Sequence, residues 1–234
     1  MLIKNIGRAV KFNTLVQPVT FSLFFARNIF VVKYLGIENY GIYVIFLAAF
    51  LFFEPLFTLI VERSLLRYLP ELRSNKQFGK CRSLVRMAIK WNLLSFILLS
   101  PIIIFVSVIF FNTYLILVIL LLIRMLFTSF RLILVSTLLS FYEHKYKNIT
   151  GFTESIISIS LVLTVLQNDP TIETAFKLLI FSSFYLSVIY GIRVFKILSY
   201  KAEELDGDIR KRFFHMSSRG IIGRYTTYIV RQKS

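Results

Sequence analysis

The sequence predicts an all-α, polytopic membrane protein with about six transmembrane helices and both termini in the cytoplasm. Three observations support this prediction. Of the 234 residues, 56% are hydrophobic and 17% are charged, with a mean hydropathy of +0.71, whereas soluble domains carry about 25% charged residues. The apolar residues form runs of about 20, the length that a helix needs to cross the hydrocarbon. The basic residues gather between these runs.

The predicted spans follow one another along the chain. The first contains Arg27 and Lys33, and a turn signal rich in Gly and Asn follows it at 36–41. The third and fourth share an apolar stretch that is long enough for two crossings, and we divide it at 111–114, where Asn and Thr favour a turn. The fifth ends before a polar run that contains Pro170. The six predicted ranges are 12–35, 42–61, 87–110, 115–141, 149–166 and 175–198.

The lysine and arginine residues predict the orientation of the spans. Three of them lie before the first span, eight in the connector 62–90, two in the connector 143–148 and many in the tail after residue 200. The three intervening turns hold almost none. Because basic connectors stay in the cytoplasm, both termini are predicted to lie inside. A cleaved signal peptide is the weaker alternative, since Pro18 and Arg27 interrupt the first run and no small-residue cleavage site follows it.

Composition also excludes several classes of function. The formal net charge of +16 is explained by topology, so we expect no nucleic-acid partner. Cys81 is the single cysteine and the sequence has two histidines, which excludes an internal disulfide and a His-based metal site. A Gly-rich phosphate loop and a paired nucleophile and histidine are also missing from the sequence. We therefore expect a protein that is not an enzyme and that has no cofactor and no metal.

The connector 62–90 allows two interpretations. Its leucines and other apolar residues recur at helical spacing between basic residues. Such a pattern is typical of interfacial helices on an anionic leaflet. It is equally typical of extensions of the neighbouring spans with snorkelling basic side chains.

Two segments resemble a known family. Residues 33–43, with the sequence KYLGIENYGIY, resemble the R-x-L-G-P-E-x-Y-G-x-Y junction between the first two spans of bacterial oligosaccharide flippases. These are the Wzx-like polysaccharide biosynthesis proteins of the MATE-like (MOP) superfamily. Residues 62–71, with the sequence ERSLLRYLPE, resemble that family's ALxRYxxE ending of the second span. The resemblance implies one lobe of a flippase at 1–200 and a lipid-linked oligosaccharide with an anionic diphosphate as substrate.

The sequence departs from the family in two respects. Ile37 stands where the family often has Pro, and the chain has the length of the first of the family's two similar halves. The tail, 201–234, contains a short apolar segment at 220–230 that resembles the start of a truncated seventh span. Its eleven residues reach about 16 Å, which does not cross about 30 Å of hydrocarbon. We expect a second lobe, from another copy or from a separate chain, as a partner; a truncated remnant is an equally consistent alternative.

Charges inside spans mark the candidate site, because a charge at mid-bilayer costs about 2.5 to 3.5 kcal/mol. Arg124 and Arg131 are seven residues apart in the fourth span, so they face the same way. If the span is centred near Thr128, both lie within about 6 Å of the midplane. Two guanidinium groups on one face suit a diphosphate. The alternative role is pairing with Glu54 or Glu154 to hold helices together.

Three further charges complete the candidate set. Arg27 is assigned with the two arginines to substrate binding. Glu54 precedes Pro55, which kinks a helix and frees a carbonyl, so this carboxylate either binds a coupling ion or neutralises an arginine. Glu154 is assigned to the same coupling or charge-pairing role and is predicted near the cytoplasmic end of the fifth span.

The sequence thus predicts transbilayer flipping of a polyprenyl-diphosphate-linked oligosaccharide at the cell inner membrane, for cell-surface polysaccharide synthesis. Membrane lipid, the anionic glycan and a second lobe are the expected partners. A non-transporting membrane subunit of a polysaccharide export system is the alternative from another functional class.

Overall fold

The computed structural model describes residues 2–58, 61–110 and 114–216 of the chain. Within these ranges the secondary structure is helical, and the prediction of an all-α protein is confirmed. Five of these helices are long and apolar enough to cross a membrane, so the chain is a multi-pass membrane protein. The elements are α1 (Leu2–Thr58), α2 (Val61–Ser74), α3 (Phe78–Phe110), α4 (Leu115–Ser140), α5 (His144–Leu161), the π-helical turn η2 (Val162–Leu166) and α6 (Ile172–Ile197), and residues 207–216 are also helical.

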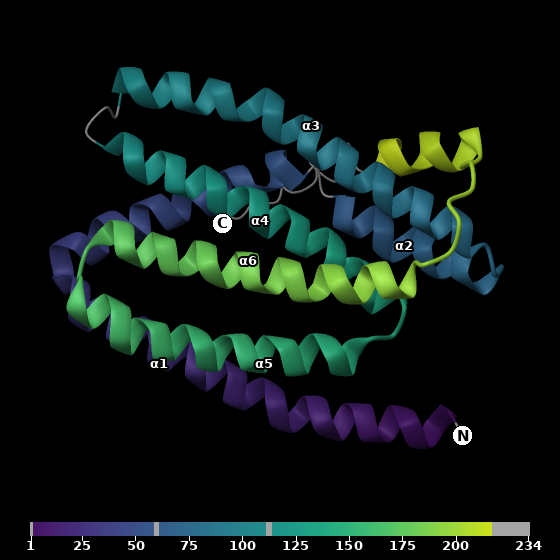
Figure 1. The fold of residues 1–234 in the computed structure, drawn as a ribbon, viewed down its shortest axis with the longest axis horizontal. Coiled ribbons are helices and arrows are strands. Elements are labelled where there is room, and N and C mark those ends of the chain that lie inside the picture. Colours follow the sequence, from purple (N-terminus) through teal and green to yellow (C-terminus); the bar gives the residue numbers. More distant parts are fainter. Residues whose placement is uncertain (1, 59–60, 111–113, 217–234) are drawn as a thin grey trace, which may run out of the picture.

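The first two predicted spans are the two arms of α1. Gly36 interrupts the helix with φ 73° and ψ 169°, a conformation that glycine adopts at little cost. The first arm runs toward one end of the molecule and the second arm returns from it (Figure 1). The 43-residue segment Val16–Thr58 therefore supplies two membrane-length pieces. The predicted turn at 36–41 is shorter than expected, because residues 37–41 are already helical.

The helix bounds agree with the predicted spans at the limits of the apolar runs. Two helices, however, begin earlier than predicted, inside basic connectors. α3 ends at Phe110, α4 begins at Leu115 and η2 ends at Leu166, as predicted. α3 and α5, however, begin at Phe78 and His144, within connectors that we expected to precede them. Basic residues are compatible with helix, so these helices continue past the apolar run. The predicted break at 111–114 falls largely on residues outside the described ranges, as does the segment at 220–230.

The connector 62–90 contains two helical parts, and the two interpretations apply to them differently. Its first part is the separate helix α2, but Leu65 and Leu69 are fully buried in a cluster with residues of α3, α4 and α6. The side of α2 that carries these leucines thus packs against protein, whereas the interfacial interpretation gives it to the leaflet. The second part is the first three turns of α3, with Leu84 fully buried in the same cluster. The span-extension interpretation therefore holds for this part.

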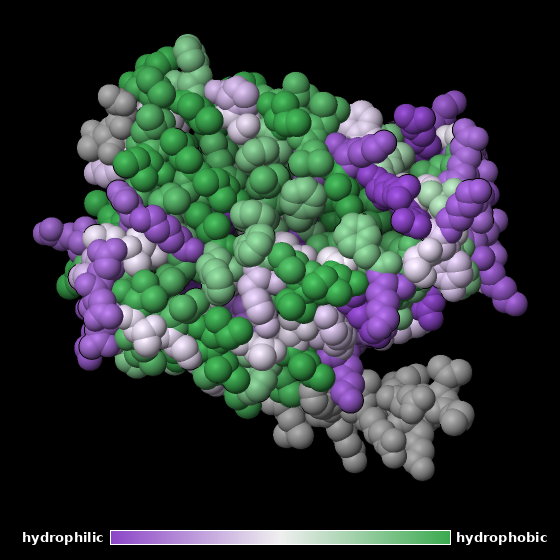
Figure 2. Space-filling model, in the orientation of Figure 1, coloured by the Kyte–Doolittle hydropathy of each residue, from purple (hydrophilic) through white to green (hydrophobic). Residues whose placement is uncertain are grey.

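Apolar side chains cover the middle of the molecule. Figure 2 shows a hydrophobic band between hydrophilic residues at both ends of the long axis. Among the exposed apolar side chains of the described residues, Phe21 is 70% exposed and Phe105 is 67% exposed. Side chains of this size gain from contact with lipid and not with water.

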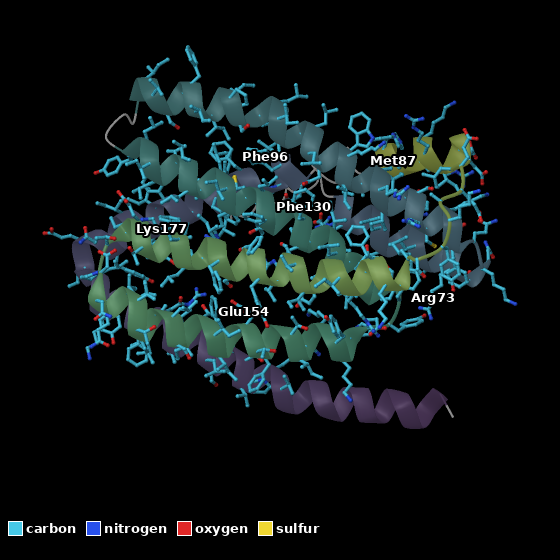
Figure 3. All side chains as sticks on the ribbon, viewed as in Figure 1. Arg73, Met87, Phe96, Phe130, Glu154 and Lys177 are labelled. Atoms are coloured by element: carbon cyan, nitrogen blue, oxygen red, sulfur yellow. The ribbon has the colours of Figure 1, made fainter. Side chains whose placement is uncertain are left out.

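The polar connectors meet at one end of the bundle, which we call the basic end and define by residues 62–90, 143–148 and 199–216. Arg73 of α2 donates a 3.0 Å hydrogen bond to the carbonyl of Ser140 at the end of α4. Lys80 of α3 pairs with Asp206 at 2.9 Å. Figure 1 shows α2, the start of α3 and the end of α6 on this side, and Figure 3 marks Arg73 and Met87 there and Lys177 at the opposite end. The grouping of connectors that the charge pattern predicts is therefore present.

Cysteine labelling tests which end faces the cytoplasm. Cys81 is fully buried and is a poor reporter, so the reporters are placed at three exposed asparagines in a Cys81→Ala background. Because basic segments stay inside, Asn39→Cys and Asn168→Cys should react with an impermeant maleimide in intact cells. Asn75→Cys at the basic end should react only after permeabilisation. Labelling of position 75 in intact cells contradicts the predicted orientation.

Candidate functional site

Arg124 lies inside the bundle on α4, with its guanidinium over the ring of Phe50 at 4.3 Å from the centroid. Its Nε and Nη1 are buried and have no hydrogen-bond partner in the described part of the chain. Buried N–H donors that lack partners cost about 1 to 3 kcal/mol each, and more on a charged group. Arg124 is therefore ready to donate hydrogen bonds to an anion that enters the bundle.

Arg27 lies on the first arm of α1 and contacts α5. Its Nη1 donates to the Ser158 hydroxyl at 3.3 Å and its Nη2 to the Asn28 side chain at 3.3 Å, while Nε is buried without a partner. Arg27 also lines a small hollow beside the π-helical turn η2, with Val162 among its neighbours. Such turns inside helices are frequent at functional sites.

The three predicted arginines are linked electrostatically through Arg124. Arg124 interacts electrostatically with both Arg27 and Arg131, and the phenol of Tyr43 interacts with Arg27 and Arg124. Three like charges in an apolar bundle repel each other and favour an anion between them. The three arginines nevertheless have different surroundings, because Arg27 lines the small hollow beside η2, Arg131 lines a separate cavity and Arg124 lines neither.

Arg131 has a different setting from Arg124, although both lie on α4. It lines a cavity of about 630 Å³ between the first arm of α1, α4, α5 and α6. We call this the basic-end cavity. Its charged residues are Arg131, Lys147 and Glu154, and its other lining residues are Val16, Gln17, Thr20, Phe21, Phe24, Leu132, Val135, Asn148, Gly151, Ser155, Leu186 and Tyr190. The lining carries a net positive charge.

Glu154 lies ten residues into α5, about 15 Å along the helix from its first residue. Its carboxylate accepts a hydrogen bond from Ser182 of α6, and Figure 3 marks it on α5. Glu154 and Arg131 both interact electrostatically with Tyr190. This position is deeper in the helix than the interfacial one we expected, because α5 begins five residues before the predicted span.

The carboxylates do not hold the arginines in ion pairs. Within the described ranges, the ion pairs at 4.0 Å or less are Lys80–Asp206, Lys177–Glu173, Arg193–Glu143 and Arg212–Asp208. Glu54 reaches Arg124 through a longer electrostatic interaction. The helix-locking role therefore lacks a direct contact for Arg124 and Arg131, and their guanidinium groups are available to a ligand.

The sequence interpretation missed Lys147, because it assigned residues 143–148 to a connector. Lys147, Gly151 and Glu154 are spaced at four and three residues, so they share one face of α5. The helical spacing from Lys147 to Glu154 indicates this shared face, provided that the helix begins before residue 149, where the predicted span begins.

Asn92 is a second residue that the sequence interpretation missed. It is 1% exposed, donates to the Phe57 carbonyl at 3.0 Å and accepts from the Ser129 hydroxyl at 2.9 Å. Ser95 adds a 3.1 Å hydrogen bond to the Leu56 carbonyl. These bonds join the last described turn of α1 to α3 and α4. They fix the second arm, which carries Phe50 and Glu54, against the helix that carries Arg124.

Replacing Asn92 by Leu should lower the free energy of unfolding by about 1 to 2 kcal/mol. The change removes the hydrogen bonds to the Phe57 carbonyl and from the Ser129 hydroxyl, which keeps its 2.8 Å bond to the Leu126 carbonyl. Interhelical hydrogen bonds in membranes have this order of magnitude. Reversible unfolding in mixed detergent micelles measures the loss. Asn39→Leu is the matched control, because Asn39 is exposed. Equal losses in the two variants would contradict the role given to Asn92.

Cationic donors, and no cluster of metal ligands, characterise the described part of this site. Across 2–58, 61–110 and 114–216, no group of three or more His, Cys, Asp or Glu side chains is placed to hold a metal ion. Cationic donors inside a protein can instead bind the oxygens of phosphate or carboxylate.

Compared with known proteins, the chain matches no family model, no curated protein and no solved structure.

Proposed function

We propose that this chain is one lobe of a transporter that moves a polyprenyl-diphosphate-linked oligosaccharide across the cell inner membrane, for cell-surface polysaccharide synthesis. The observation that carries the proposal is the buried guanidinium of Arg124, whose Nε and Nη1 lack partners, within electrostatic range of Arg27 and Arg131. A cationic site of this kind inside an apolar bundle is expensive to maintain, which argues for a function.

The chemistry of the site favours a phosphorylated headgroup. Guanidinium forks match phosphate oxygens in geometry and charge, and two phosphoryl groups offer acceptors to more than one arginine. The basic-end cavity, at about 630 Å³, lies within the usual range for small-ligand sites. Lys147 adds a cation at the end where a substrate from the cytoplasm would enter. The apolar band on the face shown in Figure 2 suits the lipid tail of such a substrate.

The resemblance to oligosaccharide flippases supports the proposal. The first motif, 33–43, surrounds the reversal at Gly36, where the positive φ accounts for a glycine in the motif. The second, 62–71, is most of α2, whose buried leucines pack against the core. Both motifs thus coincide with features on which the arrangement of the helices depends.

In the proposed mechanism no covalent bond changes. The arginines hold the diphosphate while the lobe rocks against a second lobe and exposes the site to one side and then to the other. The second lobe comes from another copy of the chain or from a separate chain. Glu54 and Glu154 balance the cationic charge when the site is empty.

Binding of simple polyprenyl lipids to the purified chain in nanodiscs tests the proposal. Polyprenyl diphosphate should bind more tightly than polyprenyl monophosphate, and polyprenol should bind least, because each phosphoryl group adds acceptors for arginine. The preference should fall in Arg124→Gln and persist in Arg63→Gln, whose parent side chain is exposed on α2. Equal binding of polyprenyl diphosphate and polyprenol would overturn the proposal and favour a non-transporting membrane subunit.

A further inference from the structure

A second hollow, of about 380 Å³, lies at the basic end between the first turns of α3 and the segment that follows α6. We call it the α3–tail hollow. It belongs neither to the basic-end cavity nor to the three arginines of the proposed site. Its lining residues are Ser83, Arg86, Met87, Lys90, Trp91, Ala202, Glu203, Glu204, Leu205 and Arg210.

Contacts on both sides hold the walls of the hollow in place. The backbone N–H of Glu203 donates to the Gly79 carbonyl at 3.3 Å, and the Ser83 hydroxyl donates to the Glu203 carbonyl. At the other side, the ring of Phe214 meets that of Trp91 at 4.5 Å in an edge-to-face arrangement. Phe213 beside it is fully buried. The tail segment is thus docked on α3.

The hollow contains charges of both signs. Arg86, Lys90 and Arg210 bring three cations, and Glu203 and Glu204 bring two carboxylates. Among the described residues, none of these five side chains takes part in an ion pair within 4.0 Å. A ligand with one negative and one positive group would therefore find partners for both.

The face of α3 that continues from the hollow toward the middle of the molecule is apolar. Arg86 and Lys90 are four residues apart, and Leu94 and Leu98 continue the same face of α3 toward the middle of the molecule. Leu94 is 43% exposed, Leu98 is 61% exposed and Ile97 between them is 62% exposed. Trp91 lies at the change from charged to apolar residues, where tryptophan is enriched at membrane interfaces. The face combines a headgroup-sized hollow with a surface for an acyl chain.

We infer that the α3–tail hollow binds the headgroup of a phosphatidylethanolamine-type lipid from the surrounding bilayer. Arg86, Lys90 and Arg210 face the phosphate, and Glu203 and Glu204 face the ammonium. One acyl chain lies along Leu94, Ile97 and Leu98. A bound headgroup bridges α3 and the tail segment, so it also strengthens their contact.

The two carboxylates decide between lipid classes. A lipid that carries only negative charge satisfies the cations but leaves Glu203 and Glu204 beside its phosphate, which is unfavourable. A phosphatidylcholine headgroup has both charges, yet its quaternary ammonium has no N–H to donate to a carboxylate. A primary ammonium can donate up to three hydrogen bonds. The inference does not depend on transport, because a resident lipid can occupy the hollow in any membrane protein with this fold.

Lipid retention by the full-length chain tests the inference. The chain is extracted from vesicles of equal parts phosphatidylethanolamine, phosphatidylglycerol and phosphatidylcholine with matched acyl chains, and the lipids that stay bound are measured by native mass spectrometry. Phosphatidylethanolamine should be enriched about two- to fivefold over each of the others, the range expected for exposed ionic contacts. Retention in proportion to the bulk mixture would overturn the inference.

Two double variants separate the roles of the charges. Glu203→Gln with Glu204→Gln should abolish the preference for phosphatidylethanolamine over phosphatidylglycerol, and Arg86→Gln with Lys90→Gln should reduce retention of both. Arg63→Gln with Glu71→Gln is the matched control on exposed residues of α2 that do not line the hollow, and it should behave as the parent. Enrichment of phosphatidylglycerol in the parent, unchanged by loss of the carboxylates, would show an anionic-lipid site and overturn the inference.

Discussion

Replacement of Arg124 by Gln is expected to reduce glycan export about 10- to 100-fold at a normal protein level. The substitution removes a charge-assisted donor to the diphosphate, an interaction of about 1.5 to 3 kcal/mol. Arg124→Lys should also be a poor replacement, because lysine keeps the charge but loses the guanidinium fork. Export is measured in a host that supplies the second lobe, and protein level by immunoblot. Arg63→Gln serves as the control, since Arg63 is exposed on α2.

A double-substitution cycle separates substrate binding from helix locking. Arg124 has no ion pair with Glu54 within 4.0 Å, so Arg124→Leu with Glu54→Leu should fail to restore export. If the two residues only neutralised each other, the single variants would lose protein and the double variant would recover it. Recovery of export in the double variant would end the substrate role of Arg124. Arg131 is tested separately with Glu154, because it lines the basic-end cavity and Arg124 does not.

Crosslinking in native membranes should show a dimer or a larger complex as the main species. The basic-end cavity presents Arg131, Lys147 and Glu154 in a lobe whose proposed second wall comes from a partner. Charged groups that face lipid are costly, so covering them favours association. Gln17→Cys at the lining of the cavity, in a Cys81→Ala background, provides a reporter for this face.

Phe105→Cys is the control for the assembly prediction. Its parent side chain is 67% exposed on α3 and does not line the basic-end cavity. Crosslinks should form at position 17 and be rare at position 105. A homodimer links two copies through position 17, whereas a separate partner gives a product of a different mass. A stable monomer in lipid and in detergent, with no crosslink at position 17, would contradict the two-lobe account.

Much of the fold was predictable, because the bilayer leaves few solutions for an apolar chain. The ends of α3, α4 and η2 follow from the limits of apolar runs. Hydropathy does not show where a helix continues into a basic connector, so the starts of α3 and α5 were missed. It also cannot show that α2 packs on the core, because an apolar stripe suits protein and lipid alike.

The candidate site was predictable in part. Arg27, Arg124 and Arg131 stand out because charges inside spans are rare. Their neighbours depend on contacts between distant segments, such as the hydrogen bond from Arg27 to Ser158, which lies 131 residues away. Such pairings leave no periodic signal in one sequence. Lys147 was missed for a different reason. Its spacing from Gly151 and Glu154 is helical, but its segment was assigned to a connector and not to a helix.

The most direct test of the central claim is transbilayer movement of the proposed substrate. The complex that crosslinking identifies is purified without crosslinks and reconstituted into liposomes with a polyprenyl-diphosphate oligosaccharide. An impermeant lectin reports the glycan on the outer surface over time. The account predicts that the complex makes the inner pool of glycan accessible, and that Arg124→Gln slows this movement without loss of protein. An inner pool that stays inaccessible with the parent complex, at the rate of protein-free liposomes, would contradict it.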